Sequence, residues 1–509
     1  MSGASICILI TIILYLAGML VIGIRCAKST SSSSDFYLGG RKLGPFVTAM
    51  SAEASDMSSY LLMGLPGLAY LSGLADVGWT IIGLGLGTYL NWLLTARRLR
   101  RYTEVTESYT LPQFFSKRFH DDKNLLSALS ALIIILFFIP YTASGFAACG
   151  KLFSSLFGWN YMASMLVSAV IIVSYTAAGG FLAASFTDFI QSIIMTIAIF
   201  IVLAFASVSA GGVGAVIENA KSLPGFLSLT SSYSESTAAS SPYSLLKIIS
   251  TVAWGLGYFG MPHILLRFMA IEDEKKLALS RRVASIWVVI AMAIAVFIGL
   301  AGRALSSESI IPVLHGSASE TIIIRIADLL SRHGVLASIL AGLTLAGILA
   351  STMSTADSQL LAASSSVSEN ILQEAMKLKL GSRTSMLAAR ITVIIIAILG
   401  IIIARDPSSS IFSIVSFAWA GFGASFGPVV ILALFWKRAT LSGALAGMAS
   451  GGISVLVWKF LISPLGGAFA IYELLPAFII GLAVNVAVSL MSKAPDASIV
   501  SEFEKSRRG

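Results

Sequence analysis

Two carboxylates lie three residues apart inside an apolar stretch of the chain. Glu53 and Asp56 belong to residues 48–66, TAMSAEASDMSSYLLMGLP, within a run long enough to cross a bilayer. A carboxylate at bilayer depth costs about 3 kcal/mol or more, so it normally faces protein or a water-filled cavity and has a partner. The glycine and proline at the end of the stretch weaken a helix, and backbone that leaves helical geometry frees carbonyls that can bind a cation. The stretch therefore predicts a broken helix at an ion or substrate site.

A second group of polar residues lies in the ninth apolar run. Ser351, Ser354, Thr355 and Ser358 are spaced i, i+3, i+4 and i+7, which places four hydroxyls on one helical face. Hard cations such as Na⁺ take oxygen ligands, and this face could supply them opposite the opened carbonyls. The alternative is that the hydroxyls bond to their own backbone or hold helices together. The spacing alone leaves both interpretations open.

A third candidate is Asp188, in AASFTDFIQS at the start of the sixth apolar run. It could be an interfacial acid whose side chain reaches water. Beside Ser185 and Thr187 it could instead be a relay site on the way of an ion to the cytoplasm.

The seventh apolar run combines aromatic residues with helix breakers. It reads TVAWGLGYFGMPHILLRF, where Trp254 lies among glycines and Pro262 follows. An aromatic wall beside a discontinuous helix suits a small amphipathic solute. Tyr141 and Thr142, in FFIPYTASG of the fourth run, would add a second aromatic surface and a hydroxyl. We expect His263 to be structural, because it lies toward the end of its run.

The composition indicates a membrane protein. The 509 residues are 56% hydrophobic and 12% charged, with a mean hydropathy of +0.88. The net charge of +9 does not indicate a nucleic-acid partner, because the basic residues sit in short loops between apolar runs. The three cysteines have no metal-type spacing, which argues against both a disulfide framework and a zinc site. We find no Ser/His/Asp set, metal cluster or phosphate-binding loop, so we do not expect an enzyme.

The apolar runs of spanning length number thirteen, which puts the two termini on opposite sides of the membrane. An external N-terminus places most of the 34 lysines and arginines on the cytoplasmic side, as the positive-inside rule expects. The runs are roughly residues 5–25, 43–71, 76–96, 124–150, 160–179, 184–208, 244–265, 280–301, 335–368, 386–404, 409–436, 440–462 and 470–491.

Four connections between the runs stand out. Residues 29–34 form a polar cytoplasmic linker, and residues 211–242, rich in Ser and Gly, form a long external loop. Residues 319–332 carry apolar residues at helical spacing, which predicts a short external helix. The tail, residues 493–509, is polar and is expected to be disordered.

Several of these motifs resemble the sodium:solute symporter family, and within it the branch that carries proline. The resemblance covers about residues 35–436 and lies in SAEASDMSSYLLMGLPG, LGLGTYLNW, YTASG, FTDFIQ, AWGLGYFGMPHILLRFM and MSTADSQLL, in that order. It implies an all-α polytopic fold of about thirteen transmembrane helices. Helices 2–6 and 7–11 would form a LeuT-like 5+5 inverted-repeat core, in which helices 2 and 7 are discontinuous.

The resemblance also implies a division of the chain. Residues 1–42 would hold the first transmembrane helix and the cytoplasmic linker, 43–210 the first inverted repeat, 211–243 the external loop, 244–436 the second inverted repeat, 437–492 helices 12 and 13, and 493–509 the cytoplasmic tail.

The resemblance further implies roles for individual residues. The sodium site would draw on the backbone carbonyls of Ala54, Met57 and Ser351 and on the hydroxyls of Ser354 and Thr355. Asp56 would tune sodium affinity, and Asp188 would lie on the inward ion path. The substrate pocket would be formed by Ser58, Tyr60, Tyr141, Thr142, Trp254, Pro262 and Ser358.

This chain departs from the proline-carrying branch at several positions. Glu53 replaces a small residue and Asp357 a serine; in the pocket, Ser59 and Tyr60 replace Gly-Trp, Thr142 replaces a cysteine and Met261 a glutamine. The pocket changes bear on the choice of solute, whereas the sodium ligands are intact. Because extra buried acids are costly unless compensated, we hypothesise that Glu53 and Asp357 add a second cation site or a titratable proton site. The alternative is that each pairs with a neighbouring donor.

We therefore expect sodium-coupled secondary active symport of L-proline or a closely related small solute into the cell, by alternating access. Na⁺ would be the coupling ion, with no organic cofactor and no nucleic-acid partner. The protein would lie in a bacterial cytoplasmic membrane with its N-terminus outside and its C-terminus in the cytoplasm. The oligomeric state stays open, and a single chain could suffice. The alternatives are a sodium- or proton-coupled carrier of another amino acid or small carboxylate, a channel, and a membrane sensor built on a transporter fold.

Overall fold

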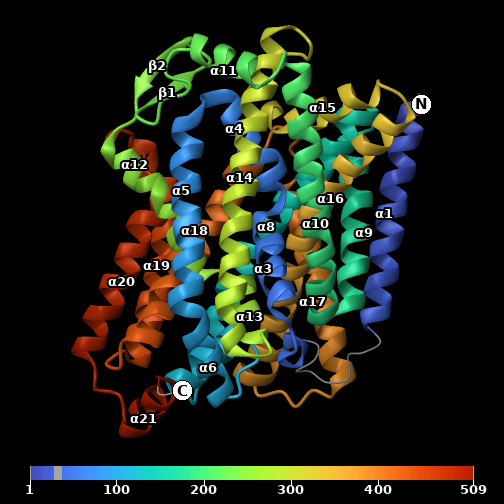
Figure 1. Ribbon diagram of the computed structural model, residues 1–509. Coiled ribbons are helices and arrows are strands. Elements are labelled where there is room, and N and C mark those ends of the chain that lie inside the picture. The colour runs from blue at the N-terminus through green and yellow to red at the C-terminus, as the bar shows by residue number, and fades with distance from the viewer. Residues whose placement is uncertain (1, 28–36, 508–509) are drawn as a thin grey trace.

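The structure is a computed structural model that describes residues 2–27 and 37–507. Long helices run side by side, and the two termini lie at opposite ends of the bundle (Figure 1). We call the end that holds the N-terminus, α11 and the hairpin the upper end, and the end that holds α6 and α21 the lower end. The linker expected at residues 29–34 lies outside the described residues.

The helices of the first half follow the expected apolar runs closely. They are α1 (Gly3–Ala27), α3 (Pro45–Ser59), η2 (Tyr60–Gly64), α4 (Leu65–Ser72), α5 (Leu74–Leu90), η3 (Asn91–Thr95), α6 (Ala96–Val105), α7 (Leu111–Arg118), α8 (Leu125–Phe157), α9 (Tyr161–Gly179) and α10 (Phe181–Ser209).

The second half begins after a small extramembranous element at the upper end. That element comprises α11 (Val213–Ser222) and the strands β1 (Ser231–Ser234) and β2 (Ala239–Pro242). The helices that follow are α12 (Leu245–Val252), η4 (Ala253–Gly260), α13 (Pro262–Ala270), α14 (Leu277–Ser307), α15 (Ile322–Ser331), α16 (Val335–Ser365), η7 (Ser366–Ala375), α17 (Ser382–Ile403), α18 (Ile411–Phe435), α19 (Leu441–Val457), α20 (Leu474–Met491) and α21 (Ala497–Arg507). Short turns of helix, η1 (Gly39–Arg41), η5 (Glu274–Lys276), η6 (Gly316–Thr321), η8 (Trp458–Ile462), η9 (Ser463–Leu465) and η10 (Gly467–Phe469), connect them.

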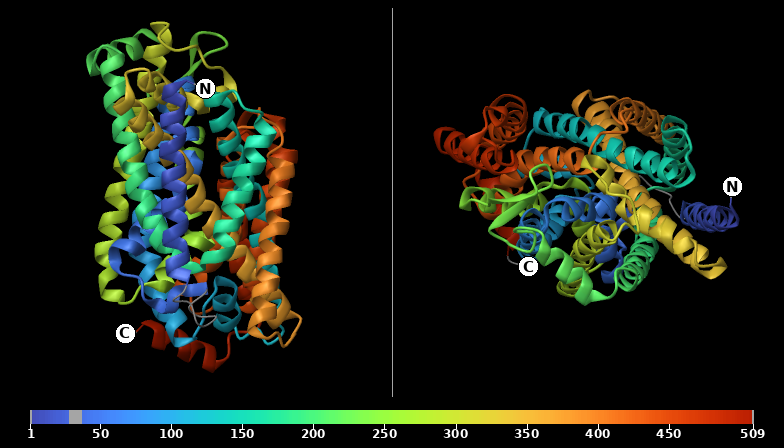
Figure 2. Two further views of the ribbon diagram at one scale, coloured as in Figure 1. Left: turned by 90° about the vertical axis from the view of Figure 1, so that its right-hand side faces the viewer. Right: turned by 90° about the horizontal axis from the view of Figure 1, so that it is seen from above.

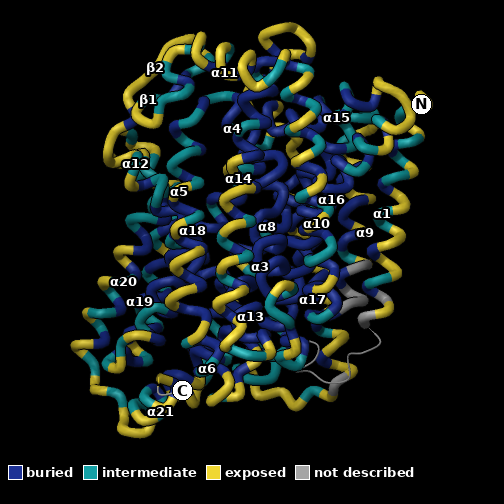
Figure 3. The backbone as a smooth tube through the Cα atoms, in the orientation of Figure 1, coloured by how far each residue is buried: buried dark blue, intermediate teal, exposed yellow. Residues whose placement is uncertain are grey.

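The described residues contain ten helices that are long and apolar enough to cross a membrane, or eleven if the bent pair of α12–η4 and α13 is one span. The protein is therefore a helical polytopic membrane protein. Apolar side chains on α1 and α17 are exposed at the periphery, whereas α3 and α16 lie in the buried interior (Figure 3). The polar stretches that the sequence places inside apolar runs are thus surrounded by protein.

Two helices in this interior are interrupted. The chain of α3 leaves helical geometry at Ser58, which has φ 47° and ψ −167°, and continues as the π-helical turn η2. A positive φ at a serine is a strained conformation that the surrounding structure must stabilise. The other interruption is at Met261, between the 3₁₀ segment η4 and α13, where the axis bends by 48°.

Glycines bring the η4 segment against α5. A Cβ at Gly87 would collide with the backbone of Gly255, and a Cβ at Gly83 would collide with the carbonyl of Val252. Small residues at both positions allow the two backbones to touch, which is how glycine commonly serves helix packing in membranes. This contact fixes the position of η4 beside α5.

The connections agree only in part with the sequence predictions. Helix α15 forms where residues 319–332 predict one, and the long loop expected at residues 211–242 contains α11 and the β1–β2 hairpin. The prediction of a disordered tail is wrong for α21, which lies across the lower end near α6 (Figure 2). The reason is Phe503, which is buried with its ring centre 5.0 Å from the Arg118 guanidinium carbon.

Candidate functional site

The interruption of α3 lies opposite the hydroxyl face of α16. The Ser354 hydroxyl donates to the carbonyl oxygen of Ala54 at 2.8 Å, and the Thr355 hydroxyl oxygen lies 3.5 Å from the same oxygen. Both hydroxyls also reach the Ser351 carbonyl oxygen, at 3.2 and 3.0 Å. The structure therefore brings four of the five expected sodium ligands together, and the hydroxyls make the backbone bonds of the alternative interpretation as well. The fifth, the Met57 carbonyl, accepts the N–H of Tyr60.

Asp56 links the interrupted helix to two other elements. Its carboxylate accepts a 2.7 Å hydrogen bond from the Tyr258 hydroxyl of η4, and its backbone carbonyl accepts a 3.1 Å bond from the Tyr141 hydroxyl of α8. The other carboxylate oxygen, Oδ1, is buried and has no hydrogen-bond partner within the described residues. Asp56 thus retains a free oxygen in the protein interior.

A small cavity adjoins Asp56. It measures about 10 Å³, which is close to the space that a single water molecule needs. No amino acid fits such a cavity, so the central pocket is too small for a solute in this conformation. Its lining comprises Asp56, Met57, Tyr60, Leu84, Tyr141, Trp254, Val415 and Trp419.

An aromatic layer lies over this cavity toward the upper end. The ring of Trp254 stacks on Tyr60 at 5.7 Å and on Tyr472 at 4.9 Å, and Phe412 contacts both Tyr60 and Trp254. Above the layer is a larger cavity of about 280 Å³, whose lining includes Trp254, Phe412 and Tyr472 together with Asp76 and Lys459 of α5 and η8. The aromatic layer therefore separates the small cavity from a polar vestibule.

A buried ionic cluster lies on the lower side of the site. Arg267 of α13 donates to the Asp188 carboxylate at 2.9 Å and to the Ser358 hydroxyl at 2.5 Å, and its Nε donates to Ser51 at 3.1 Å. Ser51 in turn donates to Asp188 at 2.7 Å. Asp357 completes the cluster, because its carboxylate accepts a 3.3 Å bond from the Ser358 hydroxyl. Removal of one partner of a buried ion pair such as this leaves an uncompensated charge.

The structure does not bring Glu53 and Asp357 together. Glu53 accepts a 3.2 Å hydrogen bond from the indole N–H of Trp92, in η3, and its charged neighbour is Asp56. The charged neighbours of Asp357 are Asp188 and Arg267. Each extra acid has a neighbouring donor, as the alternative interpretation holds, and each keeps one buried oxygen without a partner within the described ranges. The two acids therefore lie among different charged neighbours.

The expected solute residues are only partly at the cavity. Tyr60, Tyr141 and Trp254 line it. Ser58 is at the break, where its hydroxyl accepts the Tyr60 N–H at 3.1 Å. Three others lie elsewhere: Thr142 donates to Gln359 at 3.1 Å, Pro262 begins α13, and Ser358 belongs to the Arg267 cluster.

Three residues of the site were not among the sequence candidates. Trp419 lines the cavity and donates its indole N–H to the Trp254 carbonyl at 2.8 Å. Tyr258 binds Asp56, and Arg267 neutralises Asp188. The signal for Trp419 was the same as for Trp254, a tryptophan among glycines inside an apolar run. The signal for Arg267 was a basic residue next to the seventh apolar run, because such a residue can pair with an acid inside another run. His263, expected to be structural, packs its ring against Phe138 and Tyr141.

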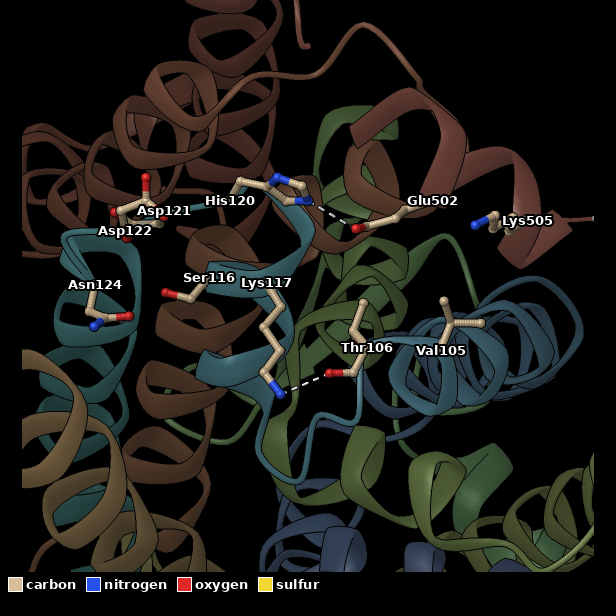
Figure 4. A pocket seen from close by; sticks show the side chains of 10 residues that line it. All are labelled: Val105, Thr106, Ser116, Lys117, His120, Asp121, Asp122, Asn124, Glu502 and Lys505. Atoms are coloured by element: carbon tan, nitrogen blue, oxygen red, sulfur yellow. Dashed lines mark hydrogen bonds and ion pairs between the residues drawn. The ribbon is translucent and has the colours of Figure 1, made fainter. Parts of the chain in front are cut away.

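A separate cavity of about 620 Å³ opens at the lower end, and it holds none of the expected site residues. It lies between the α6–α7 region and α21, where His120 bonds to Glu502 at 3.0 Å and Lys117 to the Thr106 carbonyl at 2.8 Å (Figure 4). Its lining mixes both signs of charge, including Asp121. Within the described part of the chain no group of three or more His, Cys, Asp or Glu side chains could hold a metal ion.

The family model that matches this chain is the sodium:solute symporter family, over residues 36–451. The chain belongs to that family. Two relatives, the sodium/proline symporters of Haemophilus influenzae and Escherichia coli, are 42% and 40% identical to it. The first alignment covers 98% of this chain and 97% of the relative, and the second covers 97% and 95%. The match therefore extends over nearly the whole of each protein.

Two solved structures share the fold of this family member. A Na⁺-coupled sialic acid symporter in a substrate-bound outward-open state superposes with a TM-score of 0.78, at 18% identity, and covers 96% of this chain and 99% of the other. The nucleobase-cation-symport transporter Mhp1, in a closed conformation, gives a TM-score of 0.57 at 14% identity, with coverage of 94% and 99%. The chain therefore has the fold that these two structures share.

Proposed function

We propose that this protein is a sodium-coupled symporter that carries L-proline or a closely related small solute into the cell. The observation that carries the proposal is the meeting of the α16 hydroxyls with the Ala54 carbonyl beside the break in α3. The proline activity named for relatives at 40–42% identity over nearly full length supports the choice of solute.

The sodium site consists of three carbonyl and two hydroxyl oxygens. In this structure the Ser354 and Thr355 hydroxyls donate to the carbonyls of Ala54 and Ser351. When Na⁺ enters, the two hydroxyl oxygens rotate so that their lone pairs point at the ion. The carbonyl oxygens then bind Na⁺ instead of accepting the hydroxyl protons. The Met57 carbonyl, next to the strained Ser58, completes the set when the break relaxes. The neutral ligands bind a monovalent cation without a large excess of negative charge.

The solute occupies the cavity below the aromatic layer. Tyr60, Tyr141 and Trp254 contact the apolar part of proline, and the solute carboxylate meets backbone donors or hydroxyls at the breaks. Because the cavity is smaller than proline, the pocket must expand, and rotation of the rings of Trp254 and Tyr60 connects it to the vestibule. Thr142 and Met261, which depart from the proline-carrying branch, do not line the cavity: Thr142 acts through the Gln359 side chain of α16, and Met261 acts through its position at the start of α13.

The orientation, the number of spans and the ion path follow from this assignment. The upper end, with the N-terminus, is external, and the lower end faces the cytoplasm of a bacterial cell. The broken helix α3–α4, together with α9, completes thirteen spans, and α3–α10 and α12–α18 form the two inverted repeats. Asp188 receives the ion on its inward path, where Na⁺ competes with Arg267 for the carboxylate. Sodium binds first and raises solute affinity, and linkage requires the reverse effect as well.

The test is uptake by proteoliposomes that contain the purified protein. Labelled proline is offered with an inward sodium gradient, a proton gradient or neither, and a panel of amino acids and small carboxylates competes. Saturable uptake that requires sodium and is blocked best by proline supports the proposal. Uptake driven by the proton gradient alone, or better competition by an unrelated solute, would contradict it.

A further inference from the structure

The buried pair Glu53 and Asp56 presents two unused carboxylate oxygens in the same part of the interior. Both side chains are on α3, three residues apart and almost fully buried, with exposed fractions of 1% and 4%. Trp92 donates to one oxygen of Glu53 and Tyr258 to one oxygen of Asp56. Glu53 Oε2 and Asp56 Oδ1 have no hydrogen-bond partner among the residues described.

No cation in the described structure compensates this pair. The groups that act on Glu53 are Asp56 and Trp92, and the one that acts on Asp56 is Tyr258. Asp188, by contrast, has a cationic partner, because the Arg267 guanidinium lies 2.9 Å from its carboxylate. Two carboxylates that share a dry site cannot both remain ionised without a positive charge nearby.

Neutral oxygens on the facing helix complete the surroundings. Thr88 of α5 lies beside the Tyr258 hydroxyl, and Asn91 of η3 donates its amide N–H to the Tyr258 carbonyl at 2.9 Å. Thr88 Oγ1 and Asn91 Oδ1 are fully buried and also lack a partner within the described residues. The π-helical turn η3, which contains Asn91 and Trp92, directs both side chains toward η4 and α3. The α5–η3 segment and α3 thus both present unsatisfied oxygens around Tyr258.

We propose that Glu53, Asp56, Thr88 and Asn91 hold a second sodium ion. The proposal rests on the proposed sodium coupling, and it extends it to a second ion per transport cycle. The site is distinct from the first, because the Ala54 carbonyl faces α16 whereas Glu53 and Asp56 face η3 and η4. The Asp56 carboxylate lies near both sites. An ion held at Glu53 compensates the charge of Asp56, while the ligands of the first site are all uncharged.

The test is equilibrium binding of radiolabelled sodium to the purified full-length chain, with no solute present. The wild type is expected to bind two ions per chain, Glu53→Gln one, and Ser354→Ala one. Asp121→Asn, which removes the charge of a buried carboxylate beside the separate lower-end cavity, is the matched control and is expected to keep both. Thr88→Val removes only a neutral oxygen, and it is expected to weaken one of the two binding steps about tenfold. That variant retains all charges and serves if Glu53→Gln does not fold.

The outcomes separate this proposal from the proposed function. One ion bound by the wild type, or two bound by Glu53→Gln, would overturn the second site. Loss of one ion in Glu53→Gln with no change in Ser354→Ala would support the second site and contradict the first. If the wild type binds one ion and a pH-sensitive dye reports a proton carried with each solute, the carboxylate pair holds a proton, and the sodium proposal is wrong.

Discussion

The Tyr258 hydroxyl donates a 2.7 Å hydrogen bond to the Asp56 carboxylate, and this bond joins the two interrupted helices of the protein. Tyr258 is in η4, before the bend at Met261, and Asp56 precedes the break at Ser58. A second bond, from Tyr141 to the Asp56 carbonyl, ties α8 to the same point. Any movement that opens the pocket must therefore carry α3, η4 and α8 together or break these bonds.

Replacement of Tyr258 by phenylalanine tests this junction. Because a hydrogen bond to a charged group contributes about 1.5–3 kcal/mol, we expect Tyr258→Phe to raise the sodium concentration for half-maximal proline binding about tenfold or more. Tyr70→Phe is the control, since Tyr70 is also buried but bonds to Ser306 and the Leu314 N–H at the upper end. An unchanged sodium dependence in Tyr258→Phe would show that the bond does not tune the ion site.

Substitutions of the α16 hydroxyls can distinguish an ion-binding role from ordinary hydrogen bonding to the backbone. We expect Ser354→Ala to weaken sodium activation of uptake about tenfold, because an ion ligand is lost from a dry site. Thr344→Val removes a hydroxyl of the same helix that bonds only to the Leu340 carbonyl, and it should leave sodium activation unchanged. Equal effects of the two substitutions would favour a structural role for the whole face.

Glu320 connects the aromatic layer to the upper surface. Its carboxylate accepts bonds from Lys151 at 2.7 Å, from the Ser410 hydroxyl, and from the N–H groups of Ile411 and Phe412 at the start of α18. It thereby caps α18 next to Phe412, which packs on Tyr60. Glu320 is the residue that fixes this edge of the layer.

We therefore expect Glu320→Ala to loosen the layer. Loss of one partner of a buried ion pair costs about 3–5 kcal/mol, so the thermal transition of the purified protein should fall and bound proline should leave faster. The double variant that combines Lys151→Gln with Glu320→Gln leaves no buried charge unpaired. We expect this double variant to recover much of the thermal stability. If proline release from Glu320→Ala matched the wild type, the layer would not depend on this contact.

Docking of α21 depends on one apolar side chain. We expect Phe503→Ala to free the helix, because burial of a phenylalanine ring contributes about 1.5–3 kcal/mol and the contact with Arg118 is lost as well. Limited trypsin digestion should then cleave faster after Lys505, while sodium-driven uptake is unchanged. Ile499→Ala, at a half-buried position of the same helix, is the control. Equal protection of Phe503→Ala and the wild type would mean that other contacts hold α21.

The sequence predicted the interior of this protein better than its edges. The break within residues 48–66 and the two hydroxyls of Ser354 and Thr355 that face it followed from the cost of polar groups in an apolar run and from helical periodicity. Both patterns are local, so they can be found in one sequence.

Pairings between distant segments could not be predicted in that way. The bond of Arg267 to Asp188 joins residues 79 positions apart, and the position of Trp419 beside Trp254 depends on the packing of α18 against η4. Glu53 and Asp357 appeared equivalent as acids next to one site, but their helices turn them to different neighbours. Composition also failed for the tail, because one buried ring at Phe503 outweighs its polar character.

The central claim is that the downhill entry of sodium drives proline into the cell. The most direct measurement is the accumulation of labelled proline in proteoliposomes under an imposed inward sodium gradient, followed by collapse of that gradient with a sodium ionophore. We expect proline to accumulate above its external concentration, to leak out when the ionophore is added, and to reach only equilibrium in Ser354→Ala at low sodium. Proline that merely equilibrates in the wild type, or accumulates without a sodium gradient, would contradict sodium-coupled symport.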